Sequence, residues 1–130
     1  MQCRCSDYYN SAVGEPTANE GLLCHWSAAI NGSTAARAQG VCLSGWHVPS
    51  DCEWMFLENT LGMTVANQIA TGERYSGCVR TDLKIGGSSG VSGLRSGNGN
   101  FVPAFFDRGS VGIFWPPSVR GSYTLYRYLP

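Results

Sequence analysis

Few residues in this 130-residue chain could do acid–base chemistry, and its two histidines are His25 and His47. His47 lies in the stretch Gly45–Val48, immediately before a helix start, and has no obvious nucleophile to serve as a base. We expect it to be buried or half-buried and to hydrogen-bond the turn before that helix. Asp51 and Glu53 could form a carboxylate pair, but the first turn of a helix explains both by capping and by the helix dipole.

Cysteine is the other residue type here that could do chemistry. The six cysteines stand at positions 3, 5, 24, 42, 52 and 78. An even number in a small, glycine-rich chain favours disulfides, although six cysteines allow 15 pairings and their spacing does not choose among them. Zinc is disfavoured because no C-x-x-C pair is present, and free buried thiols are the third alternative. We expect neither a metal nor a cofactor.

The charge balance excludes some partners. The net charge is zero, so no overall field recruits nucleic acid or acidic membranes. No apolar run is long enough to cross a membrane, and the start MQCRCSDYYN lacks the features of a signal peptide. We expect no nucleic-acid partner and no membrane insertion. The charge is nevertheless uneven: residues 1–85 hold five Lys/Arg and eight Asp/Glu, whereas residues 86–130 hold four Arg and one Asp.

Two capping boxes predict the helices that position these residues. Thr17 and Glu20 begin a predicted helix over 18–30, and Ser50 and Glu53 begin a second over 51–61. In the second helix Trp54, Leu57 and Leu61 share one face, and Gly62 ends the segment.

The second half of the chain predicts turns and short strands. Residues 76–101 are rich in Gly and Ser, and the expected strands lie around 111–115 and 123–129. The predicted class is therefore α+β, with two helices, short antiparallel strands and long irregular loops exposed on one side.

Four stretches resemble a known family, the Fibrobacter succinogenes major paralogous domain. They are Leu23-Cys24-His25-Trp26-Ser27-Ala28-Ala29, the block GVCLSGWHVPSDCEW over residues 40–54, Gly112-Ile113-Phe114-Trp115 and Tyr126-Arg127-Tyr128-Leu129. The similarity covers roughly residues 21–130, with Leu43 and Pro116-Pro117 departing from the family pattern. It implies a C-type lectin-like fold in one domain over 1–130. We expect an N-terminal arm at 1–16, a helical scaffold part at 17–84 and a variable ligand-binding region at 85–130.

Some relatives of this family resemble the variable proteins of diversity-generating retroelements. In those systems template adenines are replaced by any base, so AAC and AAT codons cannot become codons for Lys, Glu, Gln, Met or Trp. Residues 85–130 contain no Lys, Glu, Gln or Met, whereas residues 1–84 contain twelve. Trp115 would then be a scaffold residue. The alternative is that Gly/Ser-rich loops simply lack long polar side chains.

The resemblance implies an exposed, selected binding surface in the C-terminal region, because aromatic and Arg side chains supply much contact area. Its expected members are Val102, Pro103, Phe105, Phe106, Val111, Ile113, Pro116, Pro117, Val119, Arg120, Tyr123 and Leu125. Five further residues are expected in the core: Phe101, Phe114, Trp115, Tyr126 and Leu129.

These expectations favour a non-enzymatic module that binds a macromolecule, either a protein or a glycan on a cell surface. A phage tail tip or a bacterial cell surface would be its location. Glu15-Pro16-Thr17 only approximates the calcium-dependent sugar-binding motif of lectins, so no calcium site is expected. The alternatives are an interaction domain with one fixed partner and, less favoured, a hydrolase or oxidase. The catalytic cysteines of formylglycine-generating relatives come late in the chain, and the last cysteine here is Cys78.

Overall fold

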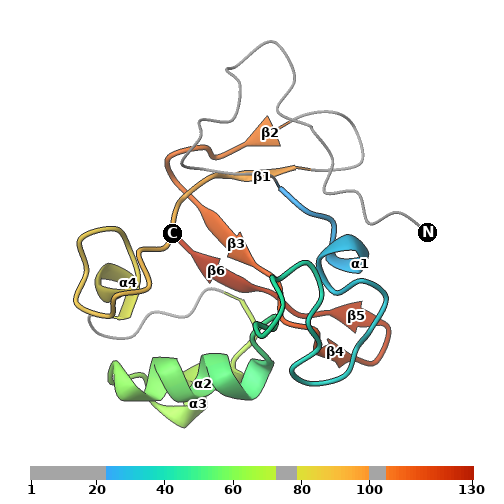
Figure 1. The fold of residues 1–130 in the computed structure, drawn as a ribbon. Helices are drawn as coiled ribbons and strands as arrows, with labels where there is room; N and C mark the ends of the chain where they lie inside the picture. Colours follow the sequence, from blue (N-terminus) through green and yellow to red (C-terminus); the bar gives the residue numbers. More distant parts are fainter. Residues whose placement is uncertain (1–22, 73–78, 100–104) are drawn as a thin grey trace.

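The structure is a computed structural model that describes residues 23–72, 79–99 and 105–130. These residues form short helices and three two-stranded antiparallel sheets, which confirms the α+β class (Figure 1). The helices are α1 (Trp26–Ala29), α2 (Asp51–Thr60), α3 (Val65–Ile69) and α4 (Val79–Asp82). The strands are β1 (Asn98–Gly99), β2 (Phe105–Phe106), β3 (Gly112–Phe114), β4 (Val119–Arg120), β5 (Tyr123–Thr124) and β6 (Arg127–Leu129).

The pair β3–β6 occupies the centre of the fold. Figure 1 shows α2 and α3 on one side of it, α4 on another, and α1 with β4–β5 at a third. Ile113 stands opposite Tyr128 in the antiparallel register. Along β6, Arg127 and Leu129 are buried and Tyr128 is exposed, as the two-residue period of a strand requires.

Helix α2 begins where its sequence predicts. The Ser50 hydroxyl accepts a hydrogen bond from the backbone N–H of Glu53, and the Glu53 carboxylate accepts one from the backbone N–H of Ser50. This capping box satisfies backbone donors that the first helical turn leaves without partners. The helix ends at Thr60, and Gly62 follows with φ +92°, a conformation that glycine adopts readily. The predicted helix over 51–61 is confirmed to within one residue.

Other predicted boundaries were wrong. The helix predicted over 18–30 is wrong over residues 23–25, which are not helical, and α1 covers only Trp26–Ala29; residues 18–22 lie outside the described residues. The predicted arm at 1–16 lies outside them too. Helices α3 and α4 were not predicted, because each is only about one turn long. The strand predicted over 123–129 is divided into β5 and β6, with a break at Leu125 and Tyr126.

The core includes Ile30, Trp54 and Leu129, which come from three distant parts of the chain. The Trp54 ring lies 5.5 Å from that of Phe114, centroid to centroid, and so packs α2 against β3. Among the five expected core residues Leu129 is buried, Phe114 and Trp115 are half-buried, and Phe101 lies outside the described residues. Tyr126 is a correction: it is 53% exposed, because only one edge of its ring rests against Trp115.

A charged cluster is buried beside this core. Arg127 on β6 forms an ion pair with Asp51 and, through Nη1, contacts Oε2 of Glu58 at 3.3 Å. The same guanidinium donates to the carbonyl oxygen of Gln68 at 3.3 Å. Arg127 and Glu58 are almost entirely buried, so their ion pair offsets part of the cost of burying both charges. We call Arg127, Asp51, Glu58 and Gln68 the Arg127 cluster; it joins β6 to both α2 and α3.

Replacing Arg127 with Met should destabilise the protein by about 3–5 kcal/mol, because the buried Glu58 carboxylate would lose its ion pair with Arg127. Urea denaturation followed by tryptophan fluorescence measures this. Arg120→Met is the matched control, since Arg120 is exposed, and should change stability by less than about 0.5 kcal/mol. A similarly small effect at both positions would contradict the importance of the Arg127 cluster. The double variant Arg127→Met/Glu58→Leu should recover part of the loss.

Candidate functional site

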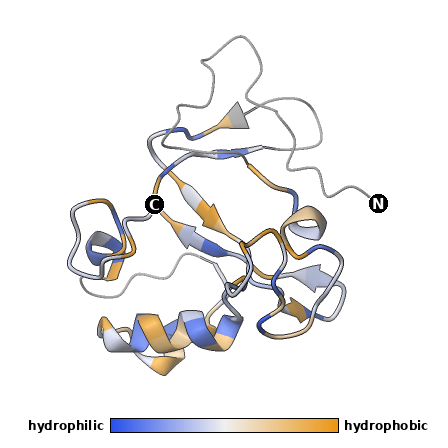
Figure 2. Cartoon of the chain, viewed as in Figure 1, coloured by the Kyte–Doolittle hydropathy of each residue, from blue (hydrophilic) through white to orange (hydrophobic). Residues whose placement is uncertain are grey.

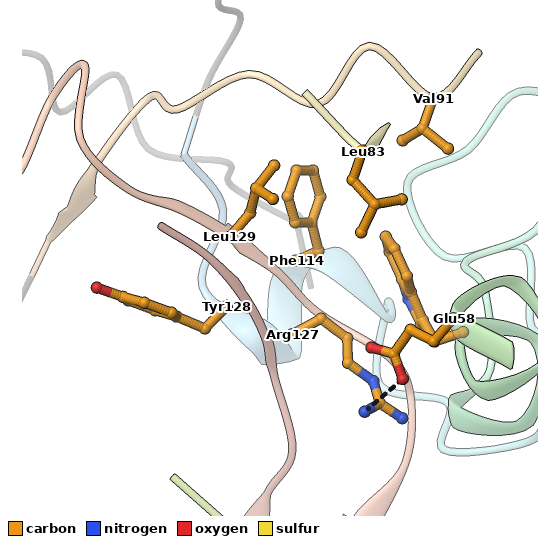
Figure 3. Close-up of a pocket in the computed structure, with 8 residues that line it drawn as sticks. Glu58, Leu83, Val91, Phe114, Arg127, Tyr128 and Leu129 are labelled. Carbon is orange, nitrogen blue, oxygen red and sulfur yellow. Dashed lines mark ion pairs between the residues drawn. The ribbon is translucent and has the colours of Figure 1, made fainter. Parts of the chain in front are cut away.

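A small cavity lies beside the Arg127 cluster, and Figure 3 shows the Arg127–Glu58 ion pair at its wall. Its volume is about 20 Å³, and Phe114, Leu129 and Leu83 also line it. That space holds about one water molecule, whereas pockets for organic ligands are typically about 300–1,000 Å³. The cavity is therefore too small to be a substrate or cofactor site.

His47, Glu53 and Ser50 are the titratable and hydroxyl groups that come closest to a catalytic arrangement. His47 Nε2 lies 2.9 Å from Glu53 Oε1, and Ser50 Oγ donates to Glu53 Oε2 at 2.8 Å. Ser50 thus donates to the carboxylate rather than to His47, and its side chain is buried. An activated serine would need the imidazole as its base. The arrangement instead fixes the helix cap. The prediction that His47 is half-buried is confirmed, whereas its hydrogen-bond partner is the Glu53 side chain within α2 rather than the turn before the helix.

These hydrogen bonds hold Glu53 in its charged form. They lower its pKa from 4.5 to about 2, mainly through the backbone N–H of Ser50, then through His47 and the Ser50 hydroxyl. Burial acts in the opposite direction but is outweighed.

The described cysteines fall into two groups. Cys24 is disulfide-bonded, whereas Cys42 and Cys52 are free thiols. Across residues 23–72, 79–99 and 105–130, no group of three or more His, Cys, Asp or Glu side chains could hold a metal ion. No helix among those same residues is long and apolar enough to span a membrane.

The predicted binding residues do not form one exposed surface. Phe106, Val119, Arg120 and Tyr123 are exposed, whereas Ile113 and Leu125 are half-buried. Figure 1 places β2, which carries Phe106, far from β4–β5. Val102, Pro103 and the side chain of Phe105 lie outside the described residues.

Three of the predicted binding residues are interior, so the expectation that they are exposed was wrong. Val111 is buried, and Pro116 and Pro117 are completely buried. The backbone at the prolines is also bonded to a distant part of the chain, since Trp26 Nε1 donates to the carbonyl oxygen of Pro116 at 3.0 Å, across 90 positions in sequence.

The segment after the prolines is held at both ends. Ser118 Oγ accepts a hydrogen bond from the backbone N–H of Asp51 at 3.3 Å, and the Ser118 carbonyl accepts one from Leu125 N–H at 3.2 Å. The residues that precede the hairpin β4–β5, Pro116 to Ser118, are therefore bonded to α1 and to the first turn of α2. We call Pro116–Ser118 the hairpin base.

The hairpin and the residues that follow it carry exposed side chains, and successive residue pairs of the hairpin point to opposite faces. Arg120 stands directly opposite Tyr123, and Val119 opposite Thr124. Tyr123 is 78% exposed. Tyr126 follows, its ring meeting Trp115 edge-on at 6.0 Å. We call Val119, Arg120, Tyr123 and Tyr126 the hairpin cluster; it offers a cation, aromatic rings and a branched aliphatic group to a partner.

Comparison with known families places most of the chain in one family. A family described as Fibrobacter succinogenes major domain matches residues 4–127. The chain belongs to the Fibrobacter succinogenes major domain family. No curated protein and no solved structure matches it.

Sequence reasoning missed a second group of exposed apolar residues in this Fibrobacter succinogenes major domain. Phe56 on α2 is 76% exposed, and Val65 and Ile69 on α3 are exposed too. Figure 2 shows hydrophobic residues along both helices. We call Phe56, Val65 and Ile69 the helical patch. Phe56 lies two positions from Trp54, on the opposite side of α2, and this spacing was the available signal.

Glu53 should make the stability of the domain depend on pH. Its folded pKa of about 2 lies below the ordinary 4.5, so the unfolded chain binds more protons between these values. The stabilisation is therefore present above about pH 4.5 and is lost as the pH falls towards 2. Urea unfolding of the native domain and of Glu53→Gln should show a stability difference at about pH 5 that narrows steadily in acid. A difference that does not change with pH would contradict a role for the Glu53 charge.

Proposed function

We propose that this domain is a non-enzymatic recognition module with a C-type lectin-like fold, which binds a macromolecular ligand through its hairpin cluster. The observation that carries the proposal is the contrast between exposed Arg120 and Tyr123 and the fully buried Pro116-Pro117 base beneath them. The ligand would be a protein or glycan on a cell surface, and the domain would act at a phage tail tip or a bacterial surface.

The physical support is preorganisation. Tyr and Arg contribute disproportionately to binding: Tyr gives a large contact area for only two side-chain torsions, and Arg gives several directed hydrogen bonds and a planar charged surface. A hairpin anchored by Trp26 and by the first turn of α2 loses little conformational freedom when it binds. Truncating an exposed hairpin side chain should therefore alter affinity without altering the scaffold.

The residue types in the hairpin cluster also support diversification by a retroelement. Val119, Arg120 and Tyr123 can all be encoded by codons that end in a pyrimidine, as diversified AAC and AAT codons do. Trp115 cannot be, and its Nε1 donates to the carbonyl oxygen of Cys24 at 2.9 Å, a scaffold role. These three exposed residues are thus compatible with variation, and Trp115, which is excluded from it, is structural.

The proposal of a non-enzymatic role rests on two features of the described residues. Ser50 is buried and bonded to a carboxylate rather than to a base, and the cavity beside Arg127 is close to the size of one water molecule. Ser50 is therefore not placed as a nucleophile, and the cavity could not admit a substrate.

Removing the Tyr123 ring should weaken ligand binding by about tenfold or more, because a hot-spot aromatic would be lost. Labelled domain is incubated with a panel of intact bacterial isolates and bound protein is measured by flow cytometry. Phe56→Ala is the matched control, since Phe56 is almost equally exposed but precedes the variable region. Melting temperatures of both variants should stay close to that of the native domain. A large drop for Tyr123→Ala would mean that Tyr123 is structural.

Gene copies from independent isolates should differ at codons 119, 120 and 123 and agree at codons 115, 116 and 117. Burial explains the second set, since Pro116 and Pro117 cannot change without disturbing the hairpin base. Sequencing the coding region and its neighbourhood measures this and should reveal a nearby near-identical repeat with adenines at the variable positions. Differences spread evenly over the chain, with no repeat, would refute diversification.

The helical patch favours a second candidate function, an interaction domain with one fixed partner. Phe56, Val65 and Ile69 are exposed apolar residues in the region before residue 85. Exposed apolar groups of this kind are typical of interaction surfaces. Under this alternative Phe56→Ala would abolish binding, and Tyr123→Ala would leave it intact.

A further inference from the structure

The segment from α4 to Arg95 brings three cationic side chains together. Arg80 lies in α4, and Lys84 follows two residues after the end of that helix, where its backbone N–H bonds the carbonyl oxygen of Thr81. Lys84 forms a parallel bridge with Gly93, two residues before Arg95. We call Arg80, Lys84 and Arg95 the basic cluster.

The neighbouring acid does not neutralise this cluster. Among the described residues, no side-chain carboxylate lies within ion-pair distance of any of the three cations. Asp82, the acidic residue of α4, instead accepts a hydrogen bond from Ser88 Oγ at 2.9 Å. Arg80 Nε has only a long contact of 3.5 Å to the backbone oxygen of Pro130. The positive charge therefore remains available to a partner.

The cations are close enough to affect one another. The pKa of Lys84 is lowered, first by burial of its ammonium group and then by the charges of Arg95 and Arg80. Like charges held together cost the folded state free energy, and an anionic ligand would remove that cost.

The apolar surroundings restrict the chemistry of the ligand. Ile85 is 66% exposed and Val91 is partly exposed, so two aliphatic side chains flank the cations. Residues 79–99 contain no aromatic side chain, and the neighbouring Tyr128, which lines the cavity with Leu83 and Val91, is only 37% exposed, so the surface beside the cations is mainly aliphatic. Guanidinium groups pair well with carboxylates, and aliphatic groups pair with aliphatic side chains.

We propose that the basic cluster and its flanking Ile85 and Val91 bind an acidic, partly aliphatic peptide segment of a partner protein. This surface is separate from the hairpin cluster, because Figure 1 shows α4 and β4–β5 on opposite sides of the β3–β6 pair. The proposal does not depend on the recognition function proposed above.

Titration of a synthetic peptide into the ¹⁵N-labelled domain at low salt tests this proposal. The probe is a peptide of about twelve residues with a Glu-Glu-Leu repeat, and the comparison peptide replaces each Glu with Gln. We expect saturable shifts of amide resonances at residues 80–95 with the acidic peptide only. Arg95→Gln should weaken binding about fivefold, as the loss of one charged contact does. Arg37→Gln, which removes an equal charge from an exposed side chain that lies 3.8 Å from Glu53 and outside the basic cluster, should change affinity less than about twofold.

Four outcomes would overturn the proposal. The first is the absence of saturable shifts at residues 80–95, and the second is equal binding of the Gln peptide. The third is an equal loss of affinity in Arg37→Gln and Arg95→Gln, which would mean that the peptide responds to the net charge of the domain rather than to the basic cluster. The fourth is tighter binding of heparin or of oligo-deoxythymidine at the same residues, which would assign the surface to a sulfated glycan or to nucleic acid. The native melting temperature of Arg95→Gln would show that the variant is folded.

Discussion

The buried guanidinium of Arg127 is the interaction on which the rest of this structure depends. The described strands are two or three residues long, and pairs of strands this short are not stable in isolation. Arg127 joins the central β3–β6 pair to Asp51 and Glu58 of α2, and to the backbone of Gln68 in α3. The desolvation of these charges is costly, so the cluster contributes one specific arrangement of the three elements rather than a large net stabilisation.

The same end of α2 also fixes the base of the hairpin. Asp51 contacts Arg127 through its side chain and Ser118 through its backbone N–H. The capping box of Ser50 and Glu53 begins the helix at this point, so a local sequence signal determines where two distant segments meet. The buried prolines and the Trp26 hydrogen bond complete the base. The hairpin is thereby attached to the scaffold by backbone and interior groups, none of which belongs to its exposed side chains.

Local features could be predicted from the sequence, and tertiary ones could not. The α2 cap depends on residues three positions apart, and its start was predicted correctly. Burial of Pro116 depends on Trp26, 90 positions away, and two adjacent prolines equally suit an exposed loop. Arg127 alternates with tyrosines, so the period of the strand does not reveal which residue points inward. The spacing of Asp51, Trp54 and Glu58 along one helical face was a usable signal, because carboxylates beside a buried Trp require a cation.

In the C-terminal segment some residues hold the hairpin to the scaffold and others are exposed to a partner, and this limits which residues can vary. Between Phe114 and Leu129, interior residues and exposed ones alternate within a few positions: Pro117 is buried, Val119 and Arg120 are exposed, and Arg127 is buried again. Replacing a whole loop at random would therefore change buried residues together with exposed ones, and so would disturb the packing of the fold. Replacement confined to chosen codons would not, because the exposed side chains bear little of the packing. The interleaving thus favours diversification targeted to single positions over recombination of segments, provided that the hairpin cluster is the surface that meets the ligand.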